Sequence, residues 1–346
     1  METLWFVIVA LTLTAYVLLD GFDIGAGIVH LFVARTDEER RVVLRTIGPV
    51  WDGNEVCLLA AGGTLFFAFP VLYASAFSGF YLPLMIVLWL LMLRALGIEF
   101  RSHIRSAVWS AFYDAIFACA SILLALFYGA ALGNVLRGVP LGADGYFFLP
   151  LWTNFRPGAV PGILDWYTVI AGLVALVALL VHGSLYLAVK TAGDLNRRAR
   201  TAVRYAWPVL ALLTVLSLFA TVAVRPQLLD NYRAHPVALL IPLIVLLALA
   251  ALAYYHQEGE EQRAFAASSA YLAAMLVGAV FAVYPQVLPA IDPRYSLTIS
   301  NAAAAPYGLK IGLVWWSIGI VIAIGYFAFL FRLFKGRVTE ADVAEH

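Results

Sequence analysis

The stretch LWFVIVALTLTAYVLLDGFDIGAGIVHLFV, residues 4–33, decides the fold class. A helix needs about 20 mostly apolar residues to cross a ~30 Å hydrocarbon core, and this stretch is longer than that. No Lys or Arg precedes the apolar run, whereas a secretory signal has a basic segment there. We therefore predict that the stretch is a retained first transmembrane helix.

The composition extends this prediction to the whole chain. Of 346 residues, 63% are hydrophobic and 12% are charged, and the mean hydropathy is +0.90. A soluble domain carries about 25% charged residues, so this chain has too few charges to cover a surface that faces water. The net charge of +1 indicates no strongly acidic or basic partner. Cys57 and Cys119 lie far apart without CxxC spacing, which predicts neither a disulfide framework nor a zinc site.

About nine segments are long and apolar enough to span a membrane. We predict an all-α, polytopic integral membrane protein that forms a single transmembrane domain over residues 1–346. Its first four helices (about 4–133) and next four (about 162–288) would form two four-helix bundles, with the ninth helix (about 308–334) peripheral. The predicted spans are 4–33, 53–72, 78–97, 108–133, 162–189, 203–224, 236–255, 265–288 and 308–334.

The placement of basic residues predicts the orientation, because cytoplasmic loops of membrane proteins are enriched in Lys and Arg. With the N-terminus outside, 16 of the 22 basic residues fall on the cytoplasmic side and 6 on the other side. The opposite orientation would invert this bias. We therefore predict that the N-terminus lies outside and the C-terminus inside.

The first span carries the strongest candidate site. Asp20, Asp23, Gly27 and His30 follow a 3-4-3 spacing, which places them on one helical stripe in the cytoplasmic half of the membrane. Ionisable side chains inside a membrane are costly and invite a functional hypothesis. The two carboxylates must be protonated, hydrated or paired with a cation, such as Arg94 or a metal ion. A structural ion pair that orients helices is the alternative.

Two other positions carry acids near the cytoplasmic side. Asp52 and Asn54 open the second span, where a carboxylate can take a proton from water, but an acid at a helix N-terminus also has a purely structural explanation. Asp114 stands alone among apolar residues early in the fourth span. Glu99 and Arg101, at the end of the third span, are expected to be solvated interfacial charges.

A pair of glycines in the first span predicts close helix packing. Gly21 and Gly25 form a GxxxG pattern on a face next to the acidic stripe. Small residues at this spacing let two helix backbones approach each other.

Histidine placement bears on haem binding. A b-type haem needs axial ligands deep in a bundle, commonly His or Met. Only His30 and His182 lie within spans, near their cytoplasmic ends. A lone intramembrane His is more often a hydrogen-bonded packing residue, so we expect no haem bound by this chain alone. Walker, dinucleotide-binding and GxSxG signatures are absent from the sequence.

Several long strings identify a family. The sequence resembles subunit II of cytochrome bd-type ubiquinol oxidases in order along essentially the whole chain. The first two strings are unusual because they place acids in apolar helices. The strings are LDGFDIGAG (19–27), IGPVWDGNEV (47–56), GGTLFFAFPVLYASAFSGFYLPL (62–84), LRALGIEFR (93–101) and SLTISNAAAAPYGLK (296–310).

The resemblance implies a haem-free subunit that pairs with a similarly folded subunit I, which carries two b-type haems and one d-type haem. It implies a complex that couples quinol oxidation to reduction of dioxygen to water and takes protons from the cytoplasm. Some members of the family hold a structural quinone in subunit II, and small single-helix subunits can join the complex. The implied location is the inner membrane of a prokaryotic cell.

The resemblance also assigns candidate residues of a proton path toward the haems. Asp52 in the WDGN motif corresponds to the position where that path begins. Cys57 departs from the family pattern, which has the aromatic residue Trp at that position. The remaining candidates for the path or the polar interior are Asp20, Asp23, Asn54, Arg94 and Asp114.

Two other interpretations remain open from the sequence. A secondary transporter would also show two bundles and buried carboxylates, with glycine-broken helices around a midplane substrate. Its acids are expected at the midplane, whereas these lie toward one face. An assembly subunit without a proton role would differ from the first interpretation only in whether Asp52 matters.

Overall fold

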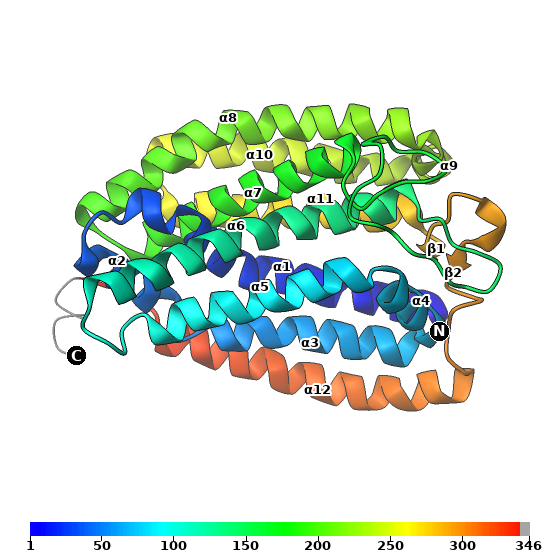
Figure 1. Ribbon diagram of the computed structural model, residues 1–346, viewed down its shortest axis with the longest axis horizontal. Coiled ribbons are helices and arrows are strands. Elements are labelled where there is room, and N and C mark those ends of the chain that lie inside the picture. The colour runs from blue at the N-terminus through cyan, green and yellow to red at the C-terminus, as the bar shows by residue number, and fades with distance from the viewer. Residues whose placement is uncertain (340–346) are drawn as a thin grey trace.

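The computed structural model describes residues 1–339 and is built almost entirely of long helices lying side by side (Figure 1). The long helices are α1 (Glu2–Val33), α3 (Trp51–Ala68), α5 (Tyr81–Phe100), α6 (Ala107–Arg137), α7 (Trp166–Lys190), α8 (Gly193–Val224), α10 (Leu240–Glu258), α11 (Glu261–Val283) and α12 (Pro306–Leu333). The short elements are α2 (Asp37–Ile47), α4 (Pro70–Gly79), α9 (Asp230–Ala234), three 3-10 turns (Pro226–Leu229, Pro236–Leu239, Pro293–Tyr295) and the antiparallel strands β1 (Gln286–Leu288) and β2 (Leu297–Thr298).

Eight helices within residues 1–339 are long and apolar enough to cross a membrane, so the prediction of nine spans is confirmed for eight. The remaining span, predicted at 53–72, corresponds to α3 and the start of α4. Asp52, Asn54 and Glu55 make the start of α3 too polar to qualify. The helix ends before Pro70, which cannot continue the backbone hydrogen bonding of α3.

Helix α3 nevertheless lies alongside α12 and leads from the α2 end of the molecule toward α4 (Figure 1). Figure 1 shows α1 beginning at the end that carries α4, β1 and β2, and α12 finishing at the opposite end, beside α2. A chain that starts at one end and finishes at the other must cross an odd number of times. The eight helices that are apolar enough to span a membrane give an even number of crossings. Helix α3 provides the additional crossing that makes the number odd.

Three differences separate the observed helices from the predicted ones. Helix α8 begins at Gly193, ten residues before the predicted start at 203, because an apolar criterion excludes its arginine-rich first turns. The predicted span 265–288 ends too late, because residues Gln286–Leu288 are a strand. The amphipathic helix α2 was not predicted. Its N-terminus is fixed by a capping box between Thr36 and Glu39.

Helix α1 is the central helix, in contact with α3, α6, α7 and α11 (Figure 1). The glycine prediction is confirmed at its contact with α7. A Cβ atom on Gly25 would fall 2.0 Å from the carbonyl oxygen of Leu179 and 2.7 Å from the Cα of Gly183. Only glycine at both positions permits this approach, which fixes the position of the acidic stripe of α1 relative to α7.

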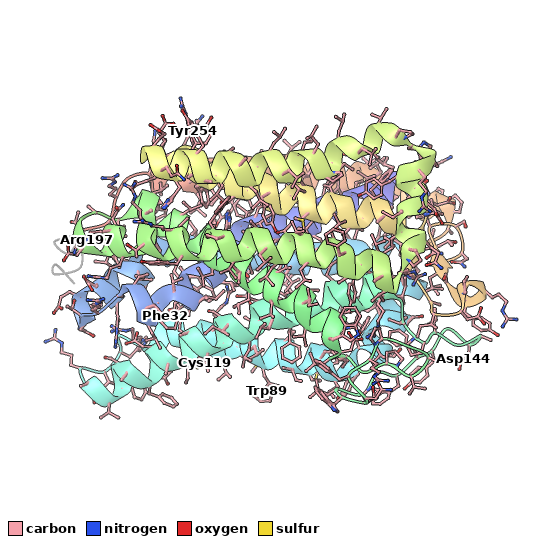
Figure 2. The ribbon with its side chains drawn as sticks, turned by 90° about the horizontal axis from the view of Figure 1, so that it is seen from above. Phe32, Trp89, Cys119, Asp144, Arg197 and Tyr254 are labelled. Carbon is pink, nitrogen blue, oxygen red and sulfur yellow. The ribbon has the colours of Figure 1, made fainter. Side chains whose placement is uncertain are left out.

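Helix α12 lies at the edge of the molecule beside α3 (Figure 1). Its side chains are mostly exposed, and its N-terminal part is held by the Trp5 indole, which donates to the Leu309 carbonyl at 3.2 Å. Outward-facing apolar residues are expected of a chain whose solvent is lipid. In Figure 2 the two ends of the bundle are marked by Arg197 and Asp144, and Trp89 and Cys119 lie along the apolar flank between them.

Two buried polar clusters as the candidate functional site

The first cluster joins α1, α3 and α5, and we call it the Asp20 cluster; its members are Asp20, Asp23, Asn54, Glu55 and Arg94. Arg94 Nη1 donates to Asp20 Oδ1 at 2.6 Å, and Arg94 Nη2 donates to Glu55 Oε2 at 2.9 Å. Asn54 Nδ2 donates to Asp23 Oδ2 at 2.7 Å. The side chains of Asp20 and Arg94 are 0% exposed, whereas that of Glu55 is 23% exposed. One arginine thus connects a sealed carboxylate with one that reaches the surface.

The hydrogen bonding of the Asp20 cluster is incomplete. Asp20 Oδ2, Asp23 Oδ1, Asn54 Oδ1 and Arg94 Nε are buried without a partner within residues 1–339. Buried polar atoms normally find a partner, because leaving one unsatisfied costs about 1–3 kcal/mol. Unpaired carboxylate oxygens can be satisfied by a bound proton or by water. The cluster therefore has capacity to accept protons.

Local sequence explains why these side chains meet. Asp20 and Asp23 project from adjacent turns of α1. Asn54 and Glu55 occupy the first turns of α3, which starts just after the turn following α2. Nearer the N-terminus of α1, the Tyr16 hydroxyl lies 2.8 Å from the Tyr128 hydroxyl of α6, which adds a polar pair beside the Asp20 cluster.

The second cluster lies nearer to α2, and we call it the Asp114 cluster; its members are Asp114, His30, Arg40, Arg101 and Asp37. His30 Nε2 lies 2.6 Å from Asp114 Oδ1, and Arg101 Nε donates to the same oxygen at 2.6 Å. Arg101 Nη2 and Arg40 Nη1 each donate to Asp114 Oδ2 at 3.1 Å. Both oxygens of this carboxylate are therefore satisfied by cationic or imidazole groups.

Arg101 extends the Asp114 cluster to the surface helix α2. Its Nη2 also donates to Asp37 Oδ1 at 2.7 Å. Burial lowers the pKa of the Arg101 guanidinium, but its bonds to Asp114 and Asp37 outweigh that effect and raise the pKa above its ordinary value. Arg101 therefore remains a cation. The cluster ties α1, α2, α5 and α6 together as a network of ion pairs.

The structure divides the six predicted site residues into three groups. Asp20 and Asp23 lie together as their spacing suggested, Arg94 pairs with Asp20 as one of the predicted alternatives, and Asn54 joins them through Asp23, which was not predicted. Asp114 belongs to the other cluster. Asp52 is exposed in the first turn of α3, and its carboxylate has no hydrogen bond or ion pair within residues 1–339.

Sequence reasoning missed four members of these clusters, Glu55, Arg101, Arg40 and Asp37, and it placed His30 on the stripe of Asp20 and Asp23 rather than with Asp114. The prediction that Arg101 is a solvated charge is wrong, because its side chain is 1% exposed and paired; Glu99 is exposed, as expected. Glu55 was not singled out, although its spacing from Asp52 gave a signal. His30 bonds to Asp114 across a helix contact that no local pattern encodes.

His182 behaves as the packing residue that was expected. Its Nδ1 lies 2.7 Å from the Ser268 hydroxyl oxygen, and its Nε2 lies 3.1 Å from the Leu18 carbonyl oxygen. Its ring stacks on Phe265. Within residues 1–339, no group of three or more His, Cys, Asp or Glu side chains is arranged to hold a metal ion.

Helices that cross the molecule around buried carboxylate–arginine pairs define a polytopic membrane protein with charge held in its interior. The sequence matches the family described as "Cytochrome bd terminal oxidase subunit II" over residues 1–334. The chain belongs to this family. It is therefore a subunit of a cytochrome bd-type oxidase, an oxidoreductase complex, and the interpretation as a secondary transporter is set aside.

Individual relatives agree with the family assignment. Cytochrome bd-I ubiquinol oxidase subunit 2 of Escherichia coli (strain K12) is 31% identical over 374 residues, covering 98% of this chain and 96% of that protein. Cytochrome bd ubiquinol oxidase subunit 2 of Bacillus subtilis (strain 168) is 29% identical over 344 residues, covering 99% and 98%. A chain of the bd oxidase structure from Geobacillus thermodenitrificans shares the fold, with a TM-score of 0.74, 19% identity and coverage of 96% and 98%.

Proposed function

We propose that this chain carries protons from the cytoplasm toward the haems of a partner subunit I through the Asp20 cluster. In this proposal the partner holds haems b and d, this chain holds no haem, and the complex couples quinol oxidation to reduction of dioxygen to water. The chain also supports assembly of that complex. The location proposed for it is the inner membrane of a bacterial cell, with the N-terminus outside.

One observation carries the proposal. Asp20 and Asp23 are fully buried, and each has one carboxylate oxygen without a partner within residues 1–339. An unsatisfied oxygen is costly in a membrane interior, so each of these oxygens needs a bound proton or a water molecule, and both are components of a proton path. Oxygens that bind and release a proton explain the arrangement.

The surface connection gives the proposed path a direction. Glu55 is partly exposed and shares Arg94 with Asp20, and Asp52 lies exposed three residues earlier on α3. Both lie near the end of the molecule that carries α2 and the basic residues. With that end in the cytoplasm, as the basic residues predict, protons would pass from Asp52 and Glu55 to Asp20 and Asp23.

Asp114 has a different role in this proposal. Its carboxylate accepts from two arginines and contacts His30, so it has no free oxygen to take part in proton transfer. We assign Asp114 to the support of the fold. We also propose that the helices form two four-helix bundles with α12 at the edge, and that this arrangement supports assembly with the partner.

The test uses the whole oxidase, isolated through a tag on this chain and reconstituted in vesicles. The double variant Asp20→Asn/Asp23→Asn leaves Arg94 balanced by Glu55, so one cation still faces one anion. We expect slow quinol-driven oxygen uptake and a reduced membrane potential, with haem b and haem d bands unchanged in the reduced-minus-oxidised spectrum.

The matched control is Asp144→Asn/Asp230→Asn, which removes two exposed carboxylates at the opposite end of the molecule. It should leave uptake and potential unchanged. Normal oxygen uptake and potential in the Asp20/Asp23 variant would refute the proton path. A tagged preparation that lacks the haem-bearing partner would refute the assembly role.

A further inference from the structure

A cavity of about 410 Å³ opens at the α2 end of the molecule, between the end of α1, α2 and the start of α6. It lies outside the Asp20 cluster. Basic residues dominate its lining. The lining residues are Arg35, Asp37, Arg40, Arg41, Arg105, Ser106, Ala107, Ser110 and Ala111.

The positive charge of this cavity is not balanced by the protein. Asp37 is already paired with Arg41 at 2.9 Å and with Arg101 at 2.7 Å, and Arg40 is paired with Asp114. The guanidinium groups of Arg35 and Arg105 have no acceptor within residues 1–339. Two unpaired arginines thus face a cavity that two paired arginines also line. Such an arrangement matches an anion with several acceptor oxygens.

The start of α6 adds hydrogen-bond donors at the edge of the cavity. Ser106 is the N-cap residue, and its side chain makes no capping bond to the first turn. The backbone N–H groups there lack an intrahelical partner, and a helix N-terminus favours negative charge. The hydroxyls of Ser106 and Ser110 are further donors. Three kinds of donor therefore meet at one cavity.

The surroundings place the cavity at the level of lipid headgroups. Arg35 follows the end of α1 by two residues, and Arg105 precedes the start of α6 by two. Phe32, in the last turn of α1, is 71% exposed, and Val108, in the first turn of α6, is 81% exposed. Apolar surface therefore adjoins the basic cavity. Trp109 lies at the same level, where aromatic residues of membrane proteins are enriched. Figure 2 shows Phe32 near this end of the bundle.

We propose that this cavity binds the phosphate group of an anionic phospholipid. Arg35 and Arg105 contact the phosphate oxygens, and the acyl chains lie over the exposed apolar residues of α1 and α6. A free phosphate ion would use the same donors but would gain nothing from Phe32 and Val108. Because Arg40 lines the cavity and also binds Asp114, the bound lipid reinforces the anchoring of α2.

The test measures lipid binding to the whole, delipidated oxidase complex by native mass spectrometry. The probes are phosphatidylglycerol, phosphatidylcholine with the same acyl chains, and inorganic phosphate. The variant Arg35→Gln/Arg105→Gln removes the two unpaired guanidiniums. Its control, Arg45→Gln/Arg204→Gln, removes two exposed arginines outside the cavity.

We expect the Arg35/Arg105 variant to retain one phosphatidylglycerol fewer per complex than the wild type and the control. Each basic residue near a membrane surface contributes about five-fold to anionic lipid binding, so the pair predicts an affinity about 25-fold weaker. Phosphatidylcholine should not distinguish the variants. Equal phosphatidylglycerol retention in all three complexes would overturn the proposal. Displacement of the lipid by inorganic phosphate at millimolar concentration would also overturn it, in favour of a free anion site.

Discussion

The Asp20 cluster and the Asp114 cluster both combine buried aspartates with arginine but differ in how completely the aspartate oxygens are paired. In the Asp114 cluster both carboxylate oxygens accept hydrogen bonds, at 2.6–3.1 Å. In the Asp20 cluster, Asp20 and Asp23 each keep one oxygen without a partner within residues 1–339. A saturated buried carboxylate stabilises a fold, whereas an unsaturated one has capacity left for a proton.

The difference separates two roles that sequence spacing alone cannot. Asp20, Asp23 and Asp114 are all acids inside apolar helices, and each would be costly if left alone. Only the partners supplied by other helices show which acid is neutralised by arginine on both oxygens. Substitutions that keep side-chain shape but remove charge should therefore affect mainly stability at Asp114 and mainly turnover at Asp23, which within residues 1–339 bonds to Asn54 and to no arginine.

The largest effect is expected for Asp114→Asn. The substitution leaves Arg40 facing an uncharged amide and Arg101 with Asp37 as its remaining anion, and breaking a buried ion pair by removing one partner costs about 3–5 kcal/mol. We expect a lower midpoint of thermal unfolding and less assembled complex, with unchanged oxygen uptake per assembled haem. Thermal unfolding of the purified oxidase, compared with that of Asp144→Asn, measures this.

A variant that assembles with wild-type thermal stability but turns over slowly would contradict this contrast. Asp114 would then belong to the proton path, and the saturation of its oxygens would not be a guide to its role.

The next largest effect is expected for Asp23→Asn, now on turnover. The amide keeps an oxygen for Asn54, so the hydrogen bond of 2.7 Å can be retained and stability should change little. Loss of a group that carries a proton in the reaction typically slows it by about 10²-fold or more. Quinol-driven oxygen uptake per haem, read beside thermal unfolding, separates the two effects. Unchanged uptake in an intact complex would remove Asp23 from the path.

Features that depend on residues close together in the sequence could be predicted, and contacts between residues far apart in the sequence could not. The helical stripe of Asp20 and Asp23, the Gly25 contact with α7 and eight of the crossing helices follow from local spacing and apolar length. The bond between His30 and Asp114 joins residues 84 positions apart, and that between Arg101 and Asp37 joins residues 64 apart. Such partners depend on which helices pack together. A single sequence does not show which helices pack together, and for this reason the burial of Arg101 was not predicted.

Glu55→Gln tests whether the Asp20 cluster is reached from the surface through α3. Glutamine keeps an oxygen for Arg94 but can no longer carry a proton between water and the interior. We expect turnover to fall about tenfold, which corresponds to ~1.4 kcal/mol in the barrier. The effect should be smaller than that of Asp23→Asn, because Glu55 is 23% exposed and water reaches it directly. Oxygen uptake in vesicles measures it, and Glu99→Gln, which removes an exposed acid of α5, is the matched control.

The smallest effect is expected for Asp52→Asn, which addresses the first step of the proposed path. Asp52 is exposed and unpaired within residues 1–339, so substitution should change stability by only about 0.5 kcal/mol and should leave the complex assembled. We expect slower quinol-driven oxygen uptake, but less so than with Glu55→Gln, since water can still deliver protons to Glu55. Uptake and membrane potential equal to those of the wild type would show that protons reach Glu55 without Asp52. The path would then begin at the partly exposed carboxylate that shares Arg94 with Asp20, and the exposed acid at the start of α3 would have only a helix-terminal role.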